Sequence, residues 1–392
     1  MPPTIFISAG EASGEHYGAL LVAALKNRLS ASGQTATFFG MGGERMAAAG
    51  LKCVVRSEEM AVMGLTEVVR HLPRIWREYR KLKKSIRDRR PSVAVLIDFP
   101  EIHFRLAREL HRLGVPVIFF VSPQLWAWKK KRIRLVQKYI DKMLVIFPFE
   151  EAFYHERRVE AEFVGHPLAE LPLPSISREE FAAENGLDPA KTWIGLLPGS
   201  RPKEIGDHLP TILQAALKLP GSFEFIVPLA PTLNAGQRDE VRRLVKAHGA
   251  GLAVRLVDDA RITLLHTRAS VVASGTATVE AALIGNPFVV VYRVSALTYA
   301  IAKRVVKVPH VAMANLIAGK RIVPELIQSD FTAENIVQEI ERLLPDGPPR
   351  QSMMEELARV RGLLHPEQRE VGAIDRVAAI TLEVLGFVDS QV

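Results

Sequence analysis

The sequence has little of what several protein classes require. It contains one cysteine, Cys53, so no intrachain disulfide can form, which is typical of a chain kept in a reducing compartment. No apolar run approaches the roughly 18 residues of a membrane-spanning helix. The apolar stretch near the N-terminus covers only residues 5–9 before Glu11 follows. We therefore expect neither secretion nor a membrane span, and both absences are compatible with attachment to a membrane surface.

Motifs for metal binding and for several kinds of nucleophilic catalysis are also absent. The sequence has no HExxH, no CxxC and no GxSxG, and its aspartate pair, Asp258-Asp259, falls in a predicted loop. The single cysteine has no histidine close to it in the sequence, which argues against thiol catalysis. We therefore expect a reaction that needs no metal ion and no cofactor.

Positive charge is concentrated in the first half of the chain. Residues 1–168 hold 27 Lys and Arg against 17 Asp and Glu, a net charge of +10, whereas the whole chain carries +8. Two clusters, at 74–90 and 129–134, supply much of this excess, and either one alone is equally typical of a solvated helix face. The asymmetry indicates an anionic partner. Because recognition-helix, zinc-finger and aromatic-platform patterns are missing, we expect an anionic lipid or a phosphorylated substrate and no nucleic acid.

Predicted strands and helices alternate through most of the chain, which is typical of parallel sheets covered on both faces. The predicted strands, most of them largely apolar, lie at 4–8, 37–39, 93–97, 115–121, 143–147, 193–197, 223–228, 253–257, 269–273 and 288–292. A proline-rich stretch at 171–175 separates the two halves, and a second break at 346–349 precedes a helical tail.

This alternation predicts an α/β protein with two Rossmann-like doubly wound domains, 1–168 and 169–345, and a ligand-binding cleft between them. We expect the tail, 346–392, to pack back on the first domain or to be exchanged with a partner chain in a homodimer.

Three motifs follow predicted strands of the first half. Gly10-Glu-Ala-Ser-Gly14 precedes a helix, where glycine lets a ligand approach the backbone and the helix N-terminus favours anions, but an ordinary turn explains the spacing equally well. Asp98 ends the run 93–97 and suits either a general base for a substrate hydroxyl or an N-cap of the next helix. Gly40-Met-Gly-Gly43 lacks the full GxGxxG pattern, so we expect no nicotinamide cofactor.

Two loops of the second half suit a bound diphosphate. Leu197-Pro-Gly-Ser-Arg201 and Ser274-Gly-Thr276 each follow a strand, and the second loop opens a helix that carries Glu280. Backbone N–H groups and hydroxyls at a helix N-terminus bind phosphate, and a guanidinium adds a planar set of donors. The Glu280 carboxylate is placed to accept hydrogen bonds from ribose hydroxyls. Helix capping also explains the serine and the threonine, and neither loop is a Walker motif, which disfavours ATP.

An apolar stripe lies beside the first basic cluster. It consists of Val62, Met63, Leu65, Val68, Val69, Leu72, Ile75 and Trp76. An apolar face flanked by Lys and Arg is typical of a segment that lies on a membrane surface. The same spacing is equally typical of a helix that faces a protein core.

Taken in order, these motifs resemble those of the lipid-A-disaccharide synthase family. The resemblance runs from about residue 4 to about residue 330 and includes further matching segments. These are Val62-Met-Gly64 with Glu67, Phe120-Val-Ser-Pro123, Trp126-Ala-Trp128, Phe147-Pro-Phe-Glu150, Phe163-Val-Gly-His-Pro167, Asn315-Leu-Ile-Ala-Gly319 and Pro324-Glu-Leu-Ile-Gln328.

The resemblance implies a GT-B glycosyltransferase that needs no metal. Members of the family transfer 2,3-diacylglucosamine from UDP-2,3-diacylglucosamine to 2,3-diacylglucosamine 1-phosphate. The products are lipid A disaccharide 1-phosphate and UDP, and the anomeric centre is inverted. The expected partners are this UDP-diacylglucosamine donor, the phosphorylated lipid acceptor and a membrane surface. We expect the enzyme to be cytoplasmic and attached to the inner face of the inner membrane.

The resemblance also implies roles for individual residues. Asp98 would deprotonate the primary hydroxyl of the acceptor. The other residues implied are Ser13, Glu15 and Met63 on the acceptor side, Arg201, Ser274, Gly275, Thr276 and Glu280 around UDP, and Asn315 and Gln328 near the sugar or the diphosphate. From the apolar stripe described above, we expect Val68, Leu72 and Trp76 to lie against the membrane.

The chain departs from the usual family pattern at two places on the acceptor side. Glu15 replaces the usual aspartate, and Glu101-Ile-His103 stands where the family usually has Asp-Phe-Asn. Two alternatives to the family's reaction stay open at this stage. One is another UDP-sugar enzyme of the same architecture, such as an undecaprenyl-linked N-acetylglucosamine transferase or a UDP-N-acetylglucosamine epimerase. The other is a non-catalytic protein that binds a nucleotide sugar at a membrane surface.

Overall fold

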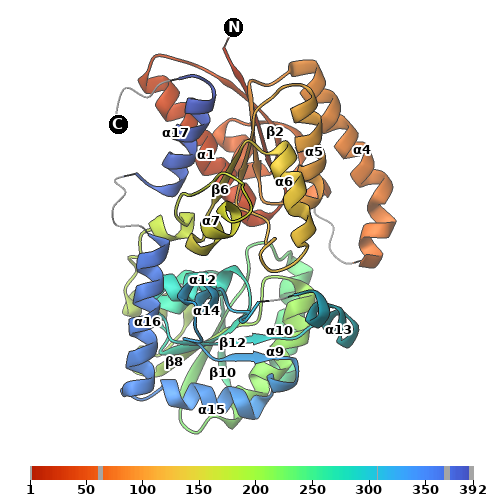
Figure 1. The fold of residues 1–392 in the computed structure, drawn as a ribbon. Coiled ribbons are helices and arrows are strands. Elements are labelled where there is room, and N and C mark those ends of the chain that lie inside the picture. Colours follow the sequence, from red (N-terminus) through yellow and green to blue (C-terminus); the bar gives the residue numbers. More distant parts are fainter. Residues whose placement is uncertain (1, 61–64, 307, 366–370, 388–392) are drawn as a thin grey trace. The chain divides into compact units, whose positions relative to one another are not determined.

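The computed structural model describes residues 2–60, 65–306, 308–365 and 371–387 (Figure 1). The chain forms two compact units. The first comprises Met1–Glu170 and Pro366–Val392, and the second comprises Leu171–His365. Among the described residues no helix is both long enough and apolar enough to span a membrane.

The first unit is built on a seven-stranded parallel sheet with the order β3-β2-β1-β4-β5-β6-β7. The strands are β1 (Thr4–Ala9), β2 (Thr37–Gly42), β3 (Lys52–Arg56), β4 (Val93–Ile97), β5 (Val117–Phe120), β6 (Lys142–Val145) and β7 (Ala161–Phe163). Every residue of β4 is buried, as its unbroken apolar sequence requires of a strand with helices on both faces. Because β1 and β4 are parallel neighbours, the segments that follow them emerge at the same edge of the sheet.

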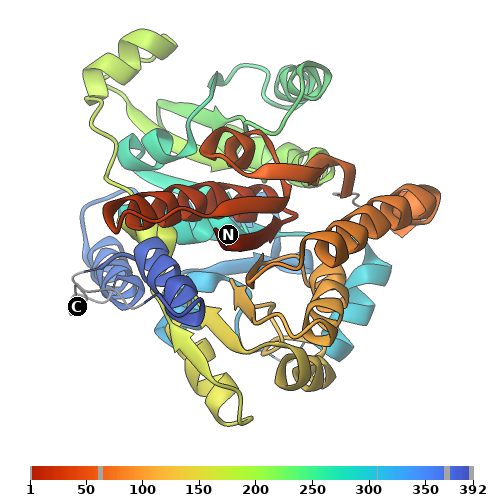
Figure 2. The same cartoon turned by 90° about the horizontal axis from the view of Figure 1, so that it is seen from above.

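Helices cover both faces of this sheet. Tyr17 and Leu21 of α1 (Ala12–Ala31) and Val377 of α17 (Ala373–Val384) belong to the core on one face. Figures 1 and 2 show α1 and α17 side by side. Leu82 of α4 and Leu106 of α5 belong to the core on the other face. The helices there include α4 (Leu65–Arg89), α5 (Pro100–Arg112), α6 (Ile133–Tyr139) and α7 (Pro148–His155). The remaining helices of this unit are short, namely α2 (Glu44–Ala49), α3 (Ser57–Met60), η1 (Lys130–Arg132) and η2 (Pro167–Glu170).

The second unit repeats this plan on a six-stranded parallel sheet with the order β10-β9-β8-β11-β12-β13. The strands are β8 (Thr192–Leu197), β9 (Phe223–Pro228), β10 (Ala253–Val257), β11 (Ala269–Ala273), β12 (Phe288–Tyr292) and β13 (Glu325–Ile327). The helices are α8 (Arg178–Asn185), α9 (Pro202–Lys218), α10 (Ala235–His248), α11 (Ala260–His266), α12 (Thr276–Ile284), α13 (Ala296–Val305), α14 (Met313–Ala318), η3 (Gln328–Asp330), α15 (Ala333–Leu343) and α16 (Pro348–Leu364). Helix α9 packs against α10 and α15, whereas α12, α14 and α16 pack together.

The segment 346–392, which we expected to act as one tail, is divided between the units. Helix α16 buries Leu357, Val360 and Leu364 and belongs to the second unit. Helix α17 buries Val377 and Ala378 against α1 and belongs to the first. The two helices therefore complete two different cores, which their helical periodicity alone does not reveal.

The glycine motif at 40–43 serves strand packing. A Cβ atom at Gly40, where φ is +157°, would lie 1.8 Å from the carbonyl oxygen of Ile7 in β1. A Cβ atom at Gly42 would lie 2.6 Å from Sδ of Met46 in α2. Glycine is thus required here because β1 and α2 approach the backbone of β2 closely.

We predict that Gly40→Ala lowers the free energy of unfolding by about 1–3 kcal/mol, the usual cost of forcing atoms into a packed core. The Ile7 carbonyl cannot move away without disturbing the pairing of β1 with β2 and β4. Gly206→Ala in α9 is the matched control, because nothing lies within 4 Å of the added methyl group. It should be neutral or stabilising by up to about 1 kcal/mol. Urea unfolding followed by circular dichroism measures both changes, and equal stability of Gly40→Ala and the parent chain would contradict the packing role.

Candidate functional site

Asp98 lies where β4 gives way to α5. Its N–H donates to the Phe120 carbonyl at 2.9 Å, which extends the pairing of β4 with β5 by one residue. The backbone then turns through two left-handed residues, Asp98 (φ 50°) and Phe99 (φ 52°), before α5 begins at Pro100. Such conformations cost about 1–3 kcal/mol each for residues other than glycine and are concentrated at functional sites. The N-cap of α5 is Phe99, so the alternative that Asp98 serves as its N-cap is wrong.

Burial changes the acidity of this carboxyl group. The pKa of Asp98 is raised to about 6, chiefly by burial and to a smaller extent by the nearby Glu11 carboxylate, while the Phe99 N–H opposes the shift. A carboxylate with a pKa near 6 is ionised at neutral pH and is a stronger base than an exposed aspartate. These are the properties that general-base catalysis needs.

The side chain of His103 forms a hydrogen bond with the backbone of this turn. The ring is fully buried, with Nδ1 2.5 Å from the Asp98 carbonyl oxygen and Nε2 2.9 Å from Oγ of Ser8 in β1. A carbonyl only accepts hydrogen bonds, so Nδ1 carries the proton and Nε2 accepts from the Ser8 hydroxyl. Burial lowers the pKa of His103 to about 4, which keeps the ring neutral at pH 7. The sequence marked His103 only as a departure from the family pattern and did not reveal this link.

The glycine turn at 10–14 lies against the Asp98 turn. A Cβ atom at Gly10 would lie 2.3 Å from the Phe99 ring, so the two turns are in direct contact. Ser13 is half-buried in the first turn of α1, and Oε1 of Glu15 accepts a hydrogen bond from the Arg45 N–H of α2 at 2.8 Å. Glu15 therefore ties α1 to the N-terminus of α2. Met63, also predicted on the acceptor side, lies outside the described residues.

The second unit contains a pocket of about 440 Å³ at the carboxyl ends of its strands, within the usual size range of ligand sites. The residues that we expected around UDP all line it, namely Arg201, Ser274, Gly275, Thr276 and Glu280. The lining also includes Asp259 and Arg261, which the sequence analysis did not assign to a site. Among the residues described, no group of three or more His, Cys, Asp or Glu side chains is arranged to hold a metal ion.

The N-terminus of α12 opens into this pocket. Gly275 is its N-cap, and no side chain caps the helix, so the alternative that Ser274 and Thr276 are helix caps is wrong. The first N–H groups of a helix have no partner within the helix and favour an anion. Arg201 is exposed and pairs with Glu204 at 3.1 Å.

Glu280 lies deeper in the same pocket. Burial raises its pKa to about 7, while Arg261 opposes the shift and Asp259 adds to it. The Arg261 guanidinium also donates to the Pro172 carbonyl at 2.8 Å, and the Asp259 carboxylate caps α11 through the Ile262 N–H. Asp259 and Arg261 are thus held in place by hydrogen bonds within the second unit.

Asn315 and Gln328 do not line this pocket. The Asn315 amide is buried; it donates to the Val323 carbonyl and to Glu325, and accepts from the backbone of 322 and 323. The Gln328 side chain bonds both the N–H and the carbonyl of Val294. Both side chains join segments of the second unit, and their contact with the sugar or diphosphate stays a prediction.

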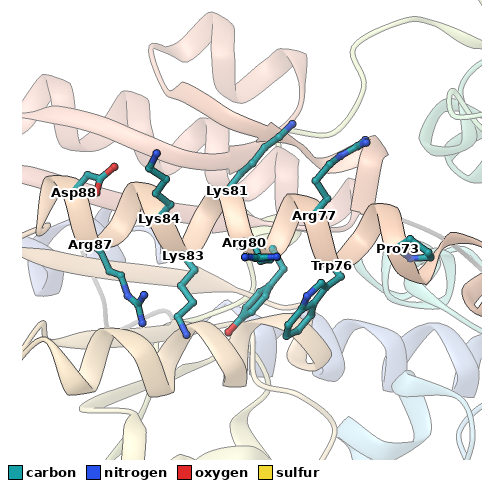
Figure 3. A pocket seen from close by; sticks show the side chains of 10 residues that line it. Pro73, Trp76, Arg77, Arg80, Lys81, Lys83, Lys84, Arg87 and Asp88 are labelled. Atoms are coloured by element: carbon teal, nitrogen blue, oxygen red, sulfur yellow. The ribbon is translucent and has the colours of Figure 1, made fainter.

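Helix α4 carries the last group of predicted residues. The Trp76 side chain is 52% exposed and stacks on Tyr79 with ring centroids 5.4 Å apart, whereas Ile75 packs against the core. A pocket of about 910 Å³ lies along this helix, and Figure 3 shows Trp76 among its basic side chains. The apolar stripe is thus divided between the core and the surface. Val68 and Leu72 belong to the same helix, but their side chains lie outside the described part of the structure.

Two doubly wound units, one with an aspartate of raised pKa at a strand end and one with a pocket at a helix N-terminus, form an architecture shared with nucleotide-sugar enzymes. The fold agrees with solved structures at low identity. The UDP-GlcNAc 2-epimerase of Neisseria meningitidis bound to UDP-GlcNAc gives a TM-score of 0.62 at 14% identity, covering 98% of this chain and 100% of that one. The calicheamicin glycosyltransferase CalG4 gives a TM-score of 0.58 at 17% identity, covering 99% of both chains.

Sequence comparison then narrows this class to one family. The family model described as lipid-A-disaccharide synthetase matches residues 5–374. A lipid-A-disaccharide synthase of Acidobacterium capsulatum is 60% identical over 98% of this chain and 96% of its own. One of Myxococcus xanthus is 43% identical over 98% of both. The chain belongs to the lipid-A-disaccharide synthase family, which confirms the resemblance seen in the sequence.

We predict that His103→Ala lowers kcat by about 10²-fold, the usual consequence of a catalytic group misplaced by about 1 Å. Removing the ring releases the Asp98 carbonyl, and because the residues expected to bind the donor's UDP belong to the pocket of the second unit, KM for the donor should stay unchanged. His103→Asn places in this chain the residue that the family usually has, and it should restore most of the rate. Steady-state kinetics on folded protein measures this pattern. Equal kcat for His103→Ala and the parent chain, or equal losses in the two variants, would contradict a positioning role.

Proposed function

We propose that this member of the family transfers 2,3-diacylglucosamine from UDP-2,3-diacylglucosamine to 2,3-diacylglucosamine 1-phosphate. The products are lipid A disaccharide 1-phosphate and UDP. The observation that carries the assignment of residues is Asp98 at the carboxyl end of β4, half-buried on a left-handed turn and with a pKa raised to about 6. The pocket at the N-terminus of α12 supports the assignment of the donor's nucleotide.

In the proposed reaction, Asp98 accepts the proton of the acceptor's primary hydroxyl as its oxygen attacks the anomeric carbon of the donor. The bond from that carbon to UDP breaks on the opposite face, and the electron pair leaves with UDP, which inverts the centre. The transferred sugar passes through a state with oxocarbenium character, by analogy with other glycosidic chemistry. Asp98 ends the step protonated and returns the proton to solvent.

The second unit would stabilise the charge that develops on the departing UDP. The N–H groups at Gly275 and Thr276 and the Arg201 guanidinium present positive ends to the diphosphate. These dipoles and the guanidinium are in place before the bond breaks, so little reorganisation is needed. When ionised, the Glu280 carboxylate would accept hydrogen bonds from the ribose hydroxyls.

The alternative reactions differ in what they need. An epimerase would convert its nucleotide sugar into another without the acylated sugar phosphate, a transferase with another acceptor would release UDP only with that acceptor, and a non-catalytic binder would do neither. Measuring UDP release with and without this acceptor separates these activities from the proposed one.

We predict that Asp98→Asn lowers kcat by about 10²–10⁴-fold, the usual contribution of a positioned general base. The change keeps the size of the side chain, so UDP affinity measured by calorimetry should stay unchanged. In the parent chain, kcat/KM should fall tenfold for each pH unit below about 6 and level off above, because only the ionised carboxylate accepts the proton. A variant that keeps full activity, or the same pH profile in both proteins, would remove Asp98 from the mechanism.

We also propose that α4 attaches the enzyme to an anionic membrane surface, at the inner face of the inner membrane. Both proposed substrates carry acyl chains, so the enzyme must meet them at a lipid surface. Trp76 offers an exposed aromatic ring of the kind found at membrane interfaces. Arg80 and Lys84 are exposed on the same helix and form none of the ion pairs found in the described part of the chain.

A homodimer formed by tail exchange stays a further proposal, which analytical ultracentrifugation tests.

We predict that Trp76→Ser reduces binding to liposomes that contain phosphatidylglycerol, because the variant loses an aromatic anchor while keeping the basic residues of α4. Leu217→Ser in α9 is the matched control, since that side chain is also exposed, at 49%, and belongs to the second unit. Flotation at low and high salt measures both contributions, and salt should weaken the binding of every variant. Undiminished flotation of Trp76→Ser, or an equal loss in Leu217→Ser, would contradict this assignment.

A further inference from the structure

Two basic side chains converge on a residue next to the catalytic turn. Glu101, in the first turn of α5, accepts hydrogen bonds from Nζ of Lys129 and Nη2 of Arg132, each at 2.7 Å. These two cations lower the pKa of Glu101 to about 2, so its carboxylate is ionised at neutral pH. Two positive charges against one negative charge leave this cluster with a net positive charge.

The cluster lies at the same edge of the sheet as Asp98. Glu101 follows β4 by the same turn, and Lys129 and Arg132 belong to the segment that follows β5. Because β4 and β5 are parallel neighbours, their carboxyl ends meet at one edge. The two cations are therefore held, through Glu101, beside the residue that we propose as the base.

The segment after β5 is anchored independently of any ligand. Trp126 is buried, and its Nε1 donates to the buried Glu150 carboxyl at 3.0 Å. Nζ of Lys129 also lies 4.0 Å from the ring centroid of Trp128, a cation–π contact. These contacts limit the conformational freedom of Lys129, which reduces the entropy lost when it binds a ligand.

Donors of both cations are still available. A guanidinium has five N–H groups and an ammonium has three, and the bond to Glu101 uses one of each. The side chains of Lys129 and Arg132 are 34% and 25% exposed, so they are reachable yet partly shielded from water. A planar guanidinium beside a point charge is an arrangement that suits a phosphate dianion.

We propose that Lys129 and Arg132 bind the phosphate of the acceptor sugar, with Glu101 orienting both cations. This inference rests on the proposed function. In the acceptor, the carbon that bears the phosphate (C1) and the carbon that carries the hydroxymethyl group (C5) flank the same ring oxygen. When the hydroxyl reaches Asp98, the phosphate must therefore lie within the breadth of one sugar ring, where Glu101 holds the two cations. The exposed face of Trp128 borders this site and can pack against the sugar.

The test compares a short-chain 2,3-diacylglucosamine acceptor with and without its 1-phosphate, using the full chain without lipid. The parent enzyme should prefer the phosphorylated acceptor in kcat/KM. Arg132→Gln and Lys129→Gln should each reduce that preference by about 10- to 100-fold, the range for a hydrogen bond to a charged group, with donor KM unchanged. Lys142→Gln is the matched control, because Lys142 pairs with Glu160 at the start of β6, the opposite edge of the sheet. It should leave the preference unchanged.

Each other outcome overturns the proposal in a distinguishable way. An unchanged preference in Arg132→Gln and Lys129→Gln, or an equal loss with both acceptors, overturns the phosphate site while leaving the reaction intact. A parent enzyme that turns over neither acceptor overturns the proposed function and this inference with it. In a second arm, flotation with phosphatidylglycerol vesicles tests the membrane as the source of phosphate. Variants that lose vesicle binding but keep the acceptor preference would assign the cations to lipid headgroups instead.

Discussion

The desolvation of one carboxylate at the end of a buried strand is the constraint on which the proposed chemistry depends. Asp98 follows a strand with no exposed residue, and burial raises its pKa to about 6. Its backbone is held in a left-handed turn by a hydrogen bond from His103 of α5, whose ring is in turn bonded to Ser8 of β1. The stability of two packed cores thus offsets both the strain and the cost of burying a charge, as is common at active sites.

Both units have a strand–turn–helix arrangement at the candidate site, and we propose a different chemical role for each. In each, a parallel strand ends at a short turn that leads into a helix, and the polar groups of that turn project beyond the edge of the sheet. In the first unit the turn carries the proposed base, and the neighbouring segment carries the cations that we propose to bind the acceptor phosphate. In the second, the turn at Gly275 leaves the N–H groups of α12 without a side-chain cap, beside Arg201. A metal-free transfer of a sugar from a diphosphate needs these two functions: removal of a proton and stabilisation of a leaving anion.

The sequence predicted most strands because most are largely apolar runs, but it missed β3, β7 and β13, which are short and contain charged residues. It predicted much of the lining of the second unit's pocket because those residues follow strand ends. Other features depend on contacts that spacing does not encode. The bond between Ser8 and His103 joins residues 95 positions apart. Ile75 and Trp76 are adjacent in the sequence, yet one packs in the core and the other is exposed. Asn315 lies in a segment that matches the family pattern, but its amide forms hydrogen bonds with neighbouring backbone groups. A motif match does not distinguish this structural role from contact with a ligand.

The central claim, that burial makes Asp98 a base poised near neutral pH, is tested most directly by titrating that carboxyl group. Carbon-13 NMR of the protein labelled at aspartate carboxyls, compared with Asp98→Asn, identifies its resonance. We expect the carboxyl signal of Asp98 to titrate with a pKa of about 6. A pKa near the ordinary aspartate value of 3.8 would contradict the desolvated-base account.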